Sequence, residues 1–433
     1  MNLLVTNTHA PQSYDIIRAL RPFANKIVVT MEGESHFKAR LSHGANSLLV
    51  DKRYYAPAPV EDWAAGKISQ ENTPLEESFV QTLLQICEKE QITVIYPTWD
   101  PYVYVLSKNL ARFQKLGVTI PVPEFDTAIN ALDKYRTVQA AQAVGFPCPR
   151  TYLYDETLDL KAVVEKEGFP LVVKPRFTSG SRGTVIVKTY EELLEKLPKV
   201  VKDHSNPLIQ EYIPGGIVTS VQFVVDRQGE IKFSFHKKKV RKLRLTSRYC
   251  TVSETFPLEQ YAIDMRKIVK QVGWYGAMGI ETMIDPRDGV QKLMEMNARY
   301  PRQLWNRLEL GINEPLMCLK IAQGQEVEAI KDYPLGVLFV CPVDDIQLLG
   351  LEVLDRLFYK FRTSIQGKEP LDNLSAPNPI IKQVQFFLET YKSNKQKLLD
   401  PYTKYFFRDP LVSILWWLQF ATWMVGGLKK IGK

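Results

Sequence analysis

Two glutamates and an asparagine near residue 290 have the types and spacing of a metal site. Glu281 and Glu295 lie on two apolar segments that are joined by the turn sequence DPRDG at residues 285–289. Asn297 follows Glu295 by two residues, so on a strand both side chains leave the same face. A hairpin would bring Glu281 opposite Glu295 and Asn297. Two carboxylates and an amide oxygen form a hard, all-oxygen site that suits Mg²⁺ bound to nucleotide phosphates.

Arg299 continues the alternation of this second segment and adds a fixed positive charge for phosphate oxygens. The alternative interpretation is an exposed hairpin that carries ordinary surface charges. These residues alone leave both interpretations open.

Four further motifs precede the hairpin in a fixed order. They are LDK at residues 132–134, LVVK at 171–174, TSGSRG at 178–183 and LIQEYIPGG at 208–216. Together with the hairpin, and in this order and approximate spacing, they resemble the ATP-grasp superfamily. Within it, the similarity is to the carbamoyl-phosphate-synthase-like and biotin-carboxylase-like carboxylate ligases, and it covers about residues 3–325.

The resemblance assigns phosphate contacts to two lysines. Lys174 ends a short apolar strand, from which its side chain can reach the α- and β-phosphates inside the nucleotide cleft. Lys134 opens a helical run and would be the second, outer phosphate lysine. The alternatives are a lysine that extends into solvent from a strand end and an ordinary surface residue at a helix start.

A serine- and glycine-containing loop follows the Lys174 strand. Its candidate nucleotide contacts are Ser179, Gly180, Ser181 and Gly183. Glycine lets backbone N–H groups approach phosphate oxygens and form an anion-binding nest. Serine and glycine are also ordinary turn residues, so the loop is informative only in its context.

The segment around residue 211 would be the hinge between the two lobes. The resemblance implies that Gln210, Glu211 and Ile213 contact the nucleotide, with backbone groups bonding the adenine edge. Many members carry another acidic residue soon afterwards, whereas residues 217–222 read IVTSVQ. We therefore expect Gln222 or a main-chain group to contact the ribose.

The fold class predicted is α/β (α+β), with three segments. Alternating strands and helices predict a small α/β domain with a mostly parallel sheet over residues 1–122, and the resemblance implies that it is the Rossmann-like pre-ATP-grasp domain. The two-lobed ATP-grasp domain would occupy residues 123–330, with its lid lobe at about 150–210, and a helical region would follow over 331–433. His9 and the Thr98–Asp100 segment follow strand ends, where ligands gather, and are candidate substrate contacts.

The resemblance implies an ADP-forming, carbon–nitrogen-bond-forming ligase that uses ATP and Mg²⁺, for which Mn²⁺ could substitute. A carboxylate would attack the γ-phosphate, and an amine, or less often a thiol, would capture the acyl phosphate. The substrates would be small molecules, and a homo-oligomer is compatible with the sequence. One alternative is a non-catalytic, membrane-associated ATP-binding module, but such a protein would be expected to lose its metal ligands.

A basic run at residues 236–248 offers a second alternative, nucleic-acid binding. It contains three candidate contacts for an anionic substrate or the acyl phosphate: Lys239, Arg241 and Arg244. A solvated basic face is the third interpretation. The run lacks interleaved aromatic residues that could stack on bases, so nucleic acid is not the expected partner.

The composition agrees with a cytoplasmic enzyme. The chain has 433 residues, enough for two or three domains, and a formal net charge of +8. Its five cysteines are scattered and form no CxxC pair, which favours a reducing compartment.

The C-terminal stretch at residues 411–428, LVSILWWLQFATWMVGGL, carries no charge and is followed by three lysines. Tryptophan favours the membrane–water interface, and lysine favours anionic lipid. The stretch therefore predicts an in-plane helix on the inner face of a membrane. A helix packed on the protein or in an oligomer interface, and a tail span, are the alternatives.

Overall fold

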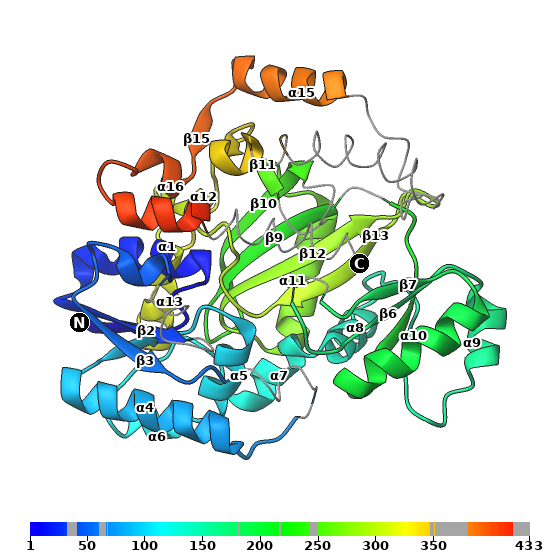
Figure 1. Ribbon diagram of the computed structural model, residues 1–433, viewed down its shortest axis with the longest axis horizontal. Coiled ribbons are helices and arrows are strands. Elements are labelled where there is room, and N and C mark those ends of the chain that lie inside the picture. Colours follow the sequence, from blue (N-terminus) through cyan, green and yellow to red (C-terminus); the bar gives the residue numbers. More distant parts are fainter. Residues whose placement is uncertain are drawn as a thin grey trace, which may run out of the picture. The chain divides into compact units, whose positions relative to one another are not determined.

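The computed structural model describes residues 1–32, 41–59, 66, 68–179, 182–215, 218–242, 250–346, 350 and 380–418. The chain divides into two compact units. The first comprises Met1–Lys237 and Pro257–Tyr333, and the second comprises Lys238–Phe256 and Pro334–Lys433. Figure 1 labels many of the helices and strands of both units.

A four-stranded parallel sheet with the order β3-β2-β1-β4 begins the first unit. Parallel neighbours need crossover connections, which explains the predicted alternation of strands and helices. The carboxyl ends of β1, β2 and β4 lie at one edge, where Asn7, Glu32 and Thr98 are found. The elements are β1 (Asn2–Val5), α1 (Pro11–Leu20), η1 (Arg21–Phe23), β2 (Lys26–Glu32), η2 (Gly44–Asn46), β3 (Lys52–Ala56), α4 (Pro74–Glu90), β4 (Val94–Tyr96), α5 (Asp100–Lys108) and α6 (Leu110–Gln114).

A second four-stranded sheet, with the order β5-β8-β6-β7, is antiparallel throughout. Helices α9 and α10 lie beside it in Figure 1. Val173, Val187, Leu193 and Ile209 belong to a small hydrophobic core of its own, so this lobe packs independently of the larger core. The elements are β5 (Thr151–Leu153), α9 (Leu160–Glu167), β6 (Leu171–Lys174), β7 (Val185–Val187), α10 (Tyr190–Asp203) and β8 (Leu208–Glu211).

The remainder of the first unit is built on strands in the order β13-β12-β9-β10. Strand β12 pairs antiparallel with both β9 and β13. Phe223, Met278 and Leu293 from these strands share a core with Met265 from α11. The elements are α7 (Phe125–Leu132), α8 (Lys134–Ala143), β9 (Val218–Val225), β10 (Ile231–Lys242), α11 (Gln260–Val272), β12 (Gly276–Ile284), β13 (Gln291–Asn297), α12 (Trp305–Glu309) and α13 (Glu314–Ala322).

The second unit contains strands as well as the predicted helices. Strand β14 pairs antiparallel with β11 and parallel with β15. Val252, Leu338 and Val340 are buried together, which gives these short strands a hydrophobic core. The elements are β11 (Cys250–Thr255), β14 (Leu338–Val340), α15 (Ile380–Lys392), β15 (Lys397–Leu399) and α16 (Pro401–Lys404).

The apolar C-terminal stretch begins as a helix at residues 410–418, and residues 419–428 lie outside the described residues. Trp416 is buried and stacks on Tyr402 with 4.5 Å between ring centroids. Trp417 stacks on Phe406 at 5.1 Å. These two tryptophans therefore pack on the protein, contrary to the expectation that they face lipid.

Beyond Pro410 at its start, the exposed residues of this helix are the aliphatic ones Leu411, Ile414 and Leu418. Their spacing places them along one side of the helix. In the part of the chain that the structure describes, no helix combines the length and the apolar character that crossing a membrane would require.

Candidate nucleotide and metal site

The predicted hairpin is formed by β12 and β13. Glu281 lies directly opposite Glu295, and Gly279 lies directly opposite Asn297. Directly opposed residues project from the same face of a sheet, so the three polar side chains share one face. Gly289 in the connecting turn has a φ of 70°, which favours glycine. The structure thus brings the three predicted metal ligands together.

A β-bulge follows the acidic pair. The register changes from Glu281–Glu295 to Thr282–Leu293, which leaves one extra residue on β13. Because of this extra residue, Glu295 and Lys292 leave the same face of the sheet although they are three positions apart. Strict alternation in the sequence would have placed them on opposite faces.

Three cations converge on Glu295. Burial raises the pKa of the Glu295 carboxyl, and the negative charge of Glu281 raises it further. Lys134, Arg299 and Lys174 act in the opposite direction and lower it. Such effects require the charges to be close in space. The three predicted phosphate-binding cations therefore lie near Glu295, although they come from α8, β6 and the segment that follows β13.

Lys174 ends strand β6 and is 8% exposed. Burial, and then the positive charge of Lys134, lower the pKa of the Lys174 ammonium to about 8, against the attraction of Glu295 and Cys148. A bound phosphate would stabilise the charged form of Lys174, because its negative charge would offset both the cost of burying the ammonium and the repulsion from Lys134. This position is not that of a lysine extended into solvent.

Lys134 begins α8 immediately after Asp133, whose carboxylate caps the helix by accepting the Tyr135 N–H at 2.9 Å. The Lys134 Nζ donates to the main-chain oxygen of Arg176 at 3.3 Å and to that of Thr178. Burial lowers the pKa of Lys134, whereas Glu295 leads the acidic residues that raise it. Lys134 therefore links the acidic pair to the start of the glycine-containing loop.

Arg299 is fixed on two sides. Its Nε lies 3.0 Å from Asp100 Oδ1, and its Nη2 donates to Asn297 Oδ1 at 3.1 Å. Burial disfavours its charge, but Asp100, Glu295 and Glu281 together raise the pKa of the guanidinium. Asp100, which follows strand β4, thus connects the parallel sheet to the acidic hairpin.

These residues suit a divalent cation with oxygen ligands. The repulsion between Glu281 and Glu295 raises the pKa of the Glu295 carboxyl, and a cation between them would relieve it. Among the described residues, no three His, Cys, Asp or Glu side chains are grouped to hold a metal. Two carboxylates and the Asn297 amide are an incomplete shell for Mg²⁺, which commonly takes its remaining oxygens from phosphates and water.

Gln222 lies beside this donor set. Strand β9 places it opposite Gly279, and a Cβ on Gly279 would lie 2.6 Å from the Gln222 amide atoms. Glycine is therefore required there for the glutamine side chain to lie across β12. Gln222 is 3% exposed, and its Oε1 is buried without a hydrogen-bond partner among the residues that the structure describes. Gln222 was expected to contact the ribose. The structure instead places it level with Asn297, because both residues pair with Gly279 from opposite sides of β12. This position follows from the strand register, which the sequence alone does not give.

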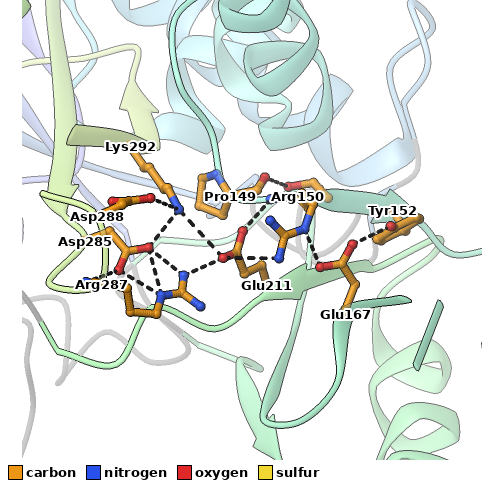
Figure 2. Close-up of polar contacts among 10 residues, drawn as sticks. Pro149, Arg150, Tyr152, Glu167, Glu211, Asp285, Arg287, Asp288 and Lys292 are labelled. Atoms are coloured by element: carbon orange, nitrogen blue, oxygen red, sulfur yellow. Dashed lines mark hydrogen bonds and ion pairs between the residues drawn. The ribbon is translucent and has the colours of Figure 1, made fainter. Parts of the chain in front are cut away.

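The hinge residue Glu211 is the centre of an ion network (Figure 2). Its Oε1 lies 3.4 Å from Arg150 Nη2 and 3.7 Å from Lys292 Nζ, and it also accepts from Arg287. Lys292 and Arg287 in turn bind Asp285 in the hairpin turn, and the Arg287 hydrogen bond leads the causes that hold the Asp285 pKa well below its usual range. The network joins the end of the lid sheet to the hairpin, a use of Glu211 that its sequence motif did not predict.

The other two hinge residues are buried. Gln210 is 2% exposed, and its amide donates to Thr151 Oγ1 at 2.7 Å. Ile213 is 6% exposed. With the side chains of Gln210 and Glu211 both bonded to protein, the nucleotide contacts predicted for this segment would fall to its main chain.

The glycine-containing loop is described at both ends, whereas Gly180 and Ser181 lie outside the described residues. Gly183 has a φ of 70°, and a Cβ there would lie 2.7 Å from His204 Nε2. The positive φ and the close contact both favour glycine at this position. Ser179 Oγ accepts a hydrogen bond from Trp99 Nε1 at 2.8 Å. Of the predicted substrate contacts at strand ends, Trp99 and Asp100 therefore touch this site, whereas His9 bonds the Glu32 backbone.

The described part of the basic run, residues 236–242, lies along strand β10. Arg244 lies outside the described residues, and Lys239 is half-buried on β10. Arg241 is 8% exposed and binds Asp345, while its Nη2 donates to Thr390 Oγ1 at 2.7 Å. Lys239 and Arg241 belong to the second unit. The structure gives Arg241 a packing contact with α15, so the expected substrate contact is corrected to a structural one.

Fold and site together define the class of protein: the chain contains an ATP-grasp domain preceded by a PylC-like N-terminal domain. Residues 131–301 match the ATP-grasp domain family, and residues 31–121 match the PylC-like N-terminal domain family. The predicted resemblance to the carbamoyl-phosphate-synthase and biotin-carboxylase branch is confirmed.

Two sequence relatives illustrate the similarity. The carbamoyl phosphate synthase large chain of Pseudomonas syringae pv. tomato is 33% identical over 119 residues, which are 27% of this chain and 11% of that protein. The D-alanine–D-alanine ligase of Pseudomonas entomophila is 35% identical over 85 residues, 20% of this chain and 27% of that protein. The chain thus matches well under two thirds of either relative.

A solved structure shows the fold over a longer range. The biotin carboxylase domain of 2-oxoglutarate carboxylase from Hydrogenobacter thermophilus, solved as a dimer with MgADP, ADP and bicarbonate, has a TM-score of 0.62. The identity is 15%, and the match covers 78% of this chain and 73% of that chain.

Proposed function

We propose that this protein is an ATP-dependent ligase that activates a small-molecule carboxylate as an acyl phosphate and transfers the acyl group to an amine, or less often to a thiol. One observation carries the proposal. The carboxylates of Glu281 and Glu295 face each other, and Lys134, Lys174 and Arg299 all act on the charge of Glu295, within the residues that match an ATP-grasp domain. This arrangement can hold a metal–triphosphate complex, which carries both positive and negative charge.

Each side chain has a distinct task in this proposal. Glu281, Glu295 and Asn297 would hold Mg²⁺, which neutralises phosphate charge when bound. Lys134, Lys174 and Arg299 place fixed positive charge where negative charge spreads during phosphoryl transfer. Arg299 is oriented by Asp100 and Asn297, so it loses little freedom when it binds an oxygen.

The loop at residues 178–183 would cover the triphosphate and exclude water from the acyl phosphate. No side-chain nucleophile is needed, because the substrate carboxylate attacks phosphorus and the second substrate attacks the acyl carbon. Positioning and charge neutralisation are the contributions of the protein.

The alternatives have less support. A non-catalytic nucleotide-binding module would not need to retain an intact set of two carboxylates and an amide. Nucleic-acid binding was suggested by the basic run, yet Lys237 and Arg241 are buried at 4% and 8% exposure. Buried cations cannot form the solvated face that phosphate backbones bind.

The test is an ADP-release screen with the full chain, Mg²⁺ and ATP over amino acids, uronic acids and other small carboxylates, each with and without amines. For an active carboxylate, ¹⁸O in its carboxyl group should appear in the released phosphate. Label that stays wholly in the product would contradict the acyl-phosphate route. Tight ATP binding without ADP release from any substrate would favour the non-catalytic module.

We also propose, as a partner, an anionic membrane surface on its cytoplasmic side. The support is the exposed row Leu411, Ile414 and Leu418, with Arg408 exposed next to it. A self-associating copy is the competing occupant, and the dimer named for the biotin carboxylase structure makes a homo-oligomer a reasonable alternative. We further propose that Mn²⁺ can replace Mg²⁺ at the site formed by Glu281, Glu295 and Asn297, because both ions accept oxygen ligands.

A further inference from the structure

Trp99 and Asp100 lie where strand β4 leads into helix α5, at the carboxyl edge of the parallel sheet. Their side chains reach two different parts of the nucleotide site. The Trp99 indole N–H donates to Ser179 Oγ at 2.8 Å, and Asp100 Oδ1 lies 3.0 Å from Arg299 Nε. All four residues belong to the first unit. One dipeptide of the N-terminal domain thus contacts both the phosphate loop and the phosphate-binding arginine.

A second contact involves the face of the same indole. The Arg182 guanidinium lies 4.9 Å from the Trp99 ring centroid. Arg182 also donates from Nη2 to Ser179 Oγ and from Nε to the Ser179 main-chain oxygen, both at 3.3 Å. The two described ends of the loop tip, Ser179 and Arg182, therefore meet on one tryptophan. The ring itself packs against the large hydrophobic core of the first unit, which fixes its position.

We propose that Trp99 is a positioning residue that holds Ser179 and Arg182, the described ends of the phosphate loop, in the arrangement that binds nucleotide phosphates. The proposal rests on the proposed function, because it assumes that residues 178–183 bind phosphate. Fixing the Ser179 and Arg182 side chains costs rotamer freedom, which opposes binding. Indole offers a single N–H donor for Ser179 and a face that attracts the Arg182 guanidinium, so it can hold both side chains in one arrangement before the nucleotide binds.

This arrangement assigns a use to Arg182 as well. Its side chain is exposed, and it follows the loop tip directly. A guanidinium held on Trp99 adds positive charge to the phosphate loop in one fixed place, and only while the loop is docked. Loss of the Trp99 hydrogen bond should therefore weaken polyphosphate binding without altering the acidic pair.

Trypsin cleavage after Arg182 measures docking without any substrate. Trp99→Phe keeps the ring but removes the N–H, and we expect cleavage at this bond to accelerate about fivefold, the effect of one net hydrogen bond. Ser179→Ala should give the same increase. The double variant should give no further increase, because each single change already removes the same hydrogen bond between Trp99 and Ser179. Trp274→Phe is the matched control, since its indole donates to Ala277 O at 3.1 Å elsewhere in the first unit.

Nucleotide affinity supplies a readout that general damage would not reproduce. Trp99→Phe and Ser179→Ala should weaken a non-hydrolysable ATP analogue about fivefold and leave AMP affinity unchanged, because AMP lacks the β- and γ-phosphates. Equal losses for both nucleotides, or wild-type cleavage after Arg182 in both variants, would overturn the docking role. If the wild-type chain bound no nucleotide, the proposed function would fail, and the cleavage rates would still decide whether Trp99 docks the loop.

Discussion

The lowered pKa of Lys174 predicts that ATP binding takes up a proton in mildly alkaline solution. Burial and the neighbouring Lys134 lower this pKa to about 8 in the free protein. A bound phosphate favours the ammonium form and raises the pKa again. Below pH 8 most of the Lys174 side chains already carry the proton, so ATP binding takes up little. Above pH 8 most have lost it, so binding must restore the proton and affinity falls as the pH rises.

The magnitude follows from the titration of one group. With a pKa of about 8, Lys174 is about nine-tenths protonated at pH 7 and about a quarter protonated at pH 8.5. Affinity for Mg-ATP should therefore fall about fourfold between these pH values and roughly thirtyfold by pH 9.5, provided that the bound form stays protonated. Calorimetry at pH 8.5 in two buffers of different ionisation enthalpy should report a net uptake of about three quarters of a proton, because Lys174 is already about a quarter protonated at that pH.

Two variants isolate the group. Lys174→Arg keeps its charge at every pH in this range, so it should abolish the decline even if its overall affinity is lower. Lys188→Arg, at an exposed position in the same lobe, should retain the wild-type profile. An affinity that stays flat from pH 7 to 9.5, or an equal decline in Lys174→Arg, would refute the reasoning.

Two predictions concern the second unit. Arg241→Met should lower the free energy of unfolding by about 3–5 kcal/mol, because it leaves Asp345 buried without its charge partner, whereas Lys395→Met, on a half-exposed lysine, should cost less than about 1 kcal/mol. Urea denaturation measures both, and equal values would contradict the structural assignment. Leu411→Asp should weaken pelleting with anionic liposomes about tenfold, while Leu194→Asp on α10 should not; wild-type protein that never pellets would remove the lipid proposal.

Local patterns in the sequence were enough to predict the acidic hairpin. The DPRDG turn and the two-residue spacing of Glu295 and Asn297 fix which face these side chains share, and the pairing with Glu281 follows. The parallel N-terminal sheet was also predictable, because its strands and helices alternate. The convergence of Lys134 and Lys174 was expected only from the resemblance, since no local pattern joins α8 to β6.

Contacts between segments that are distant in the sequence explain why the predicted and observed partners of some site residues differ. Glu211 was predicted to hold the nucleotide, but its carboxylate is bonded to Arg287, which lies 76 positions away in the sequence. Arg241 was predicted to face substrate, but its partner Asp345 lies 104 positions away. The bulge on β13 could not be predicted either, because it depends on pairing geometry rather than on residue type. Single-sequence patterns contain no information on such pairings.

The metal dependence of ATP binding in Glu295→Ala tests the central claim most directly. The wild-type protein should bind ATP more tightly as Mg²⁺ is added, and the variant should lose this dependence together with ADP formation, because one carboxylate cannot hold the ion against the surrounding cations. Glu230→Ala, at an exposed position in the same unit, should behave as wild type. A folded Glu295→Ala protein that keeps Mg²⁺-dependent ATP affinity and wild-type ADP formation would contradict the account.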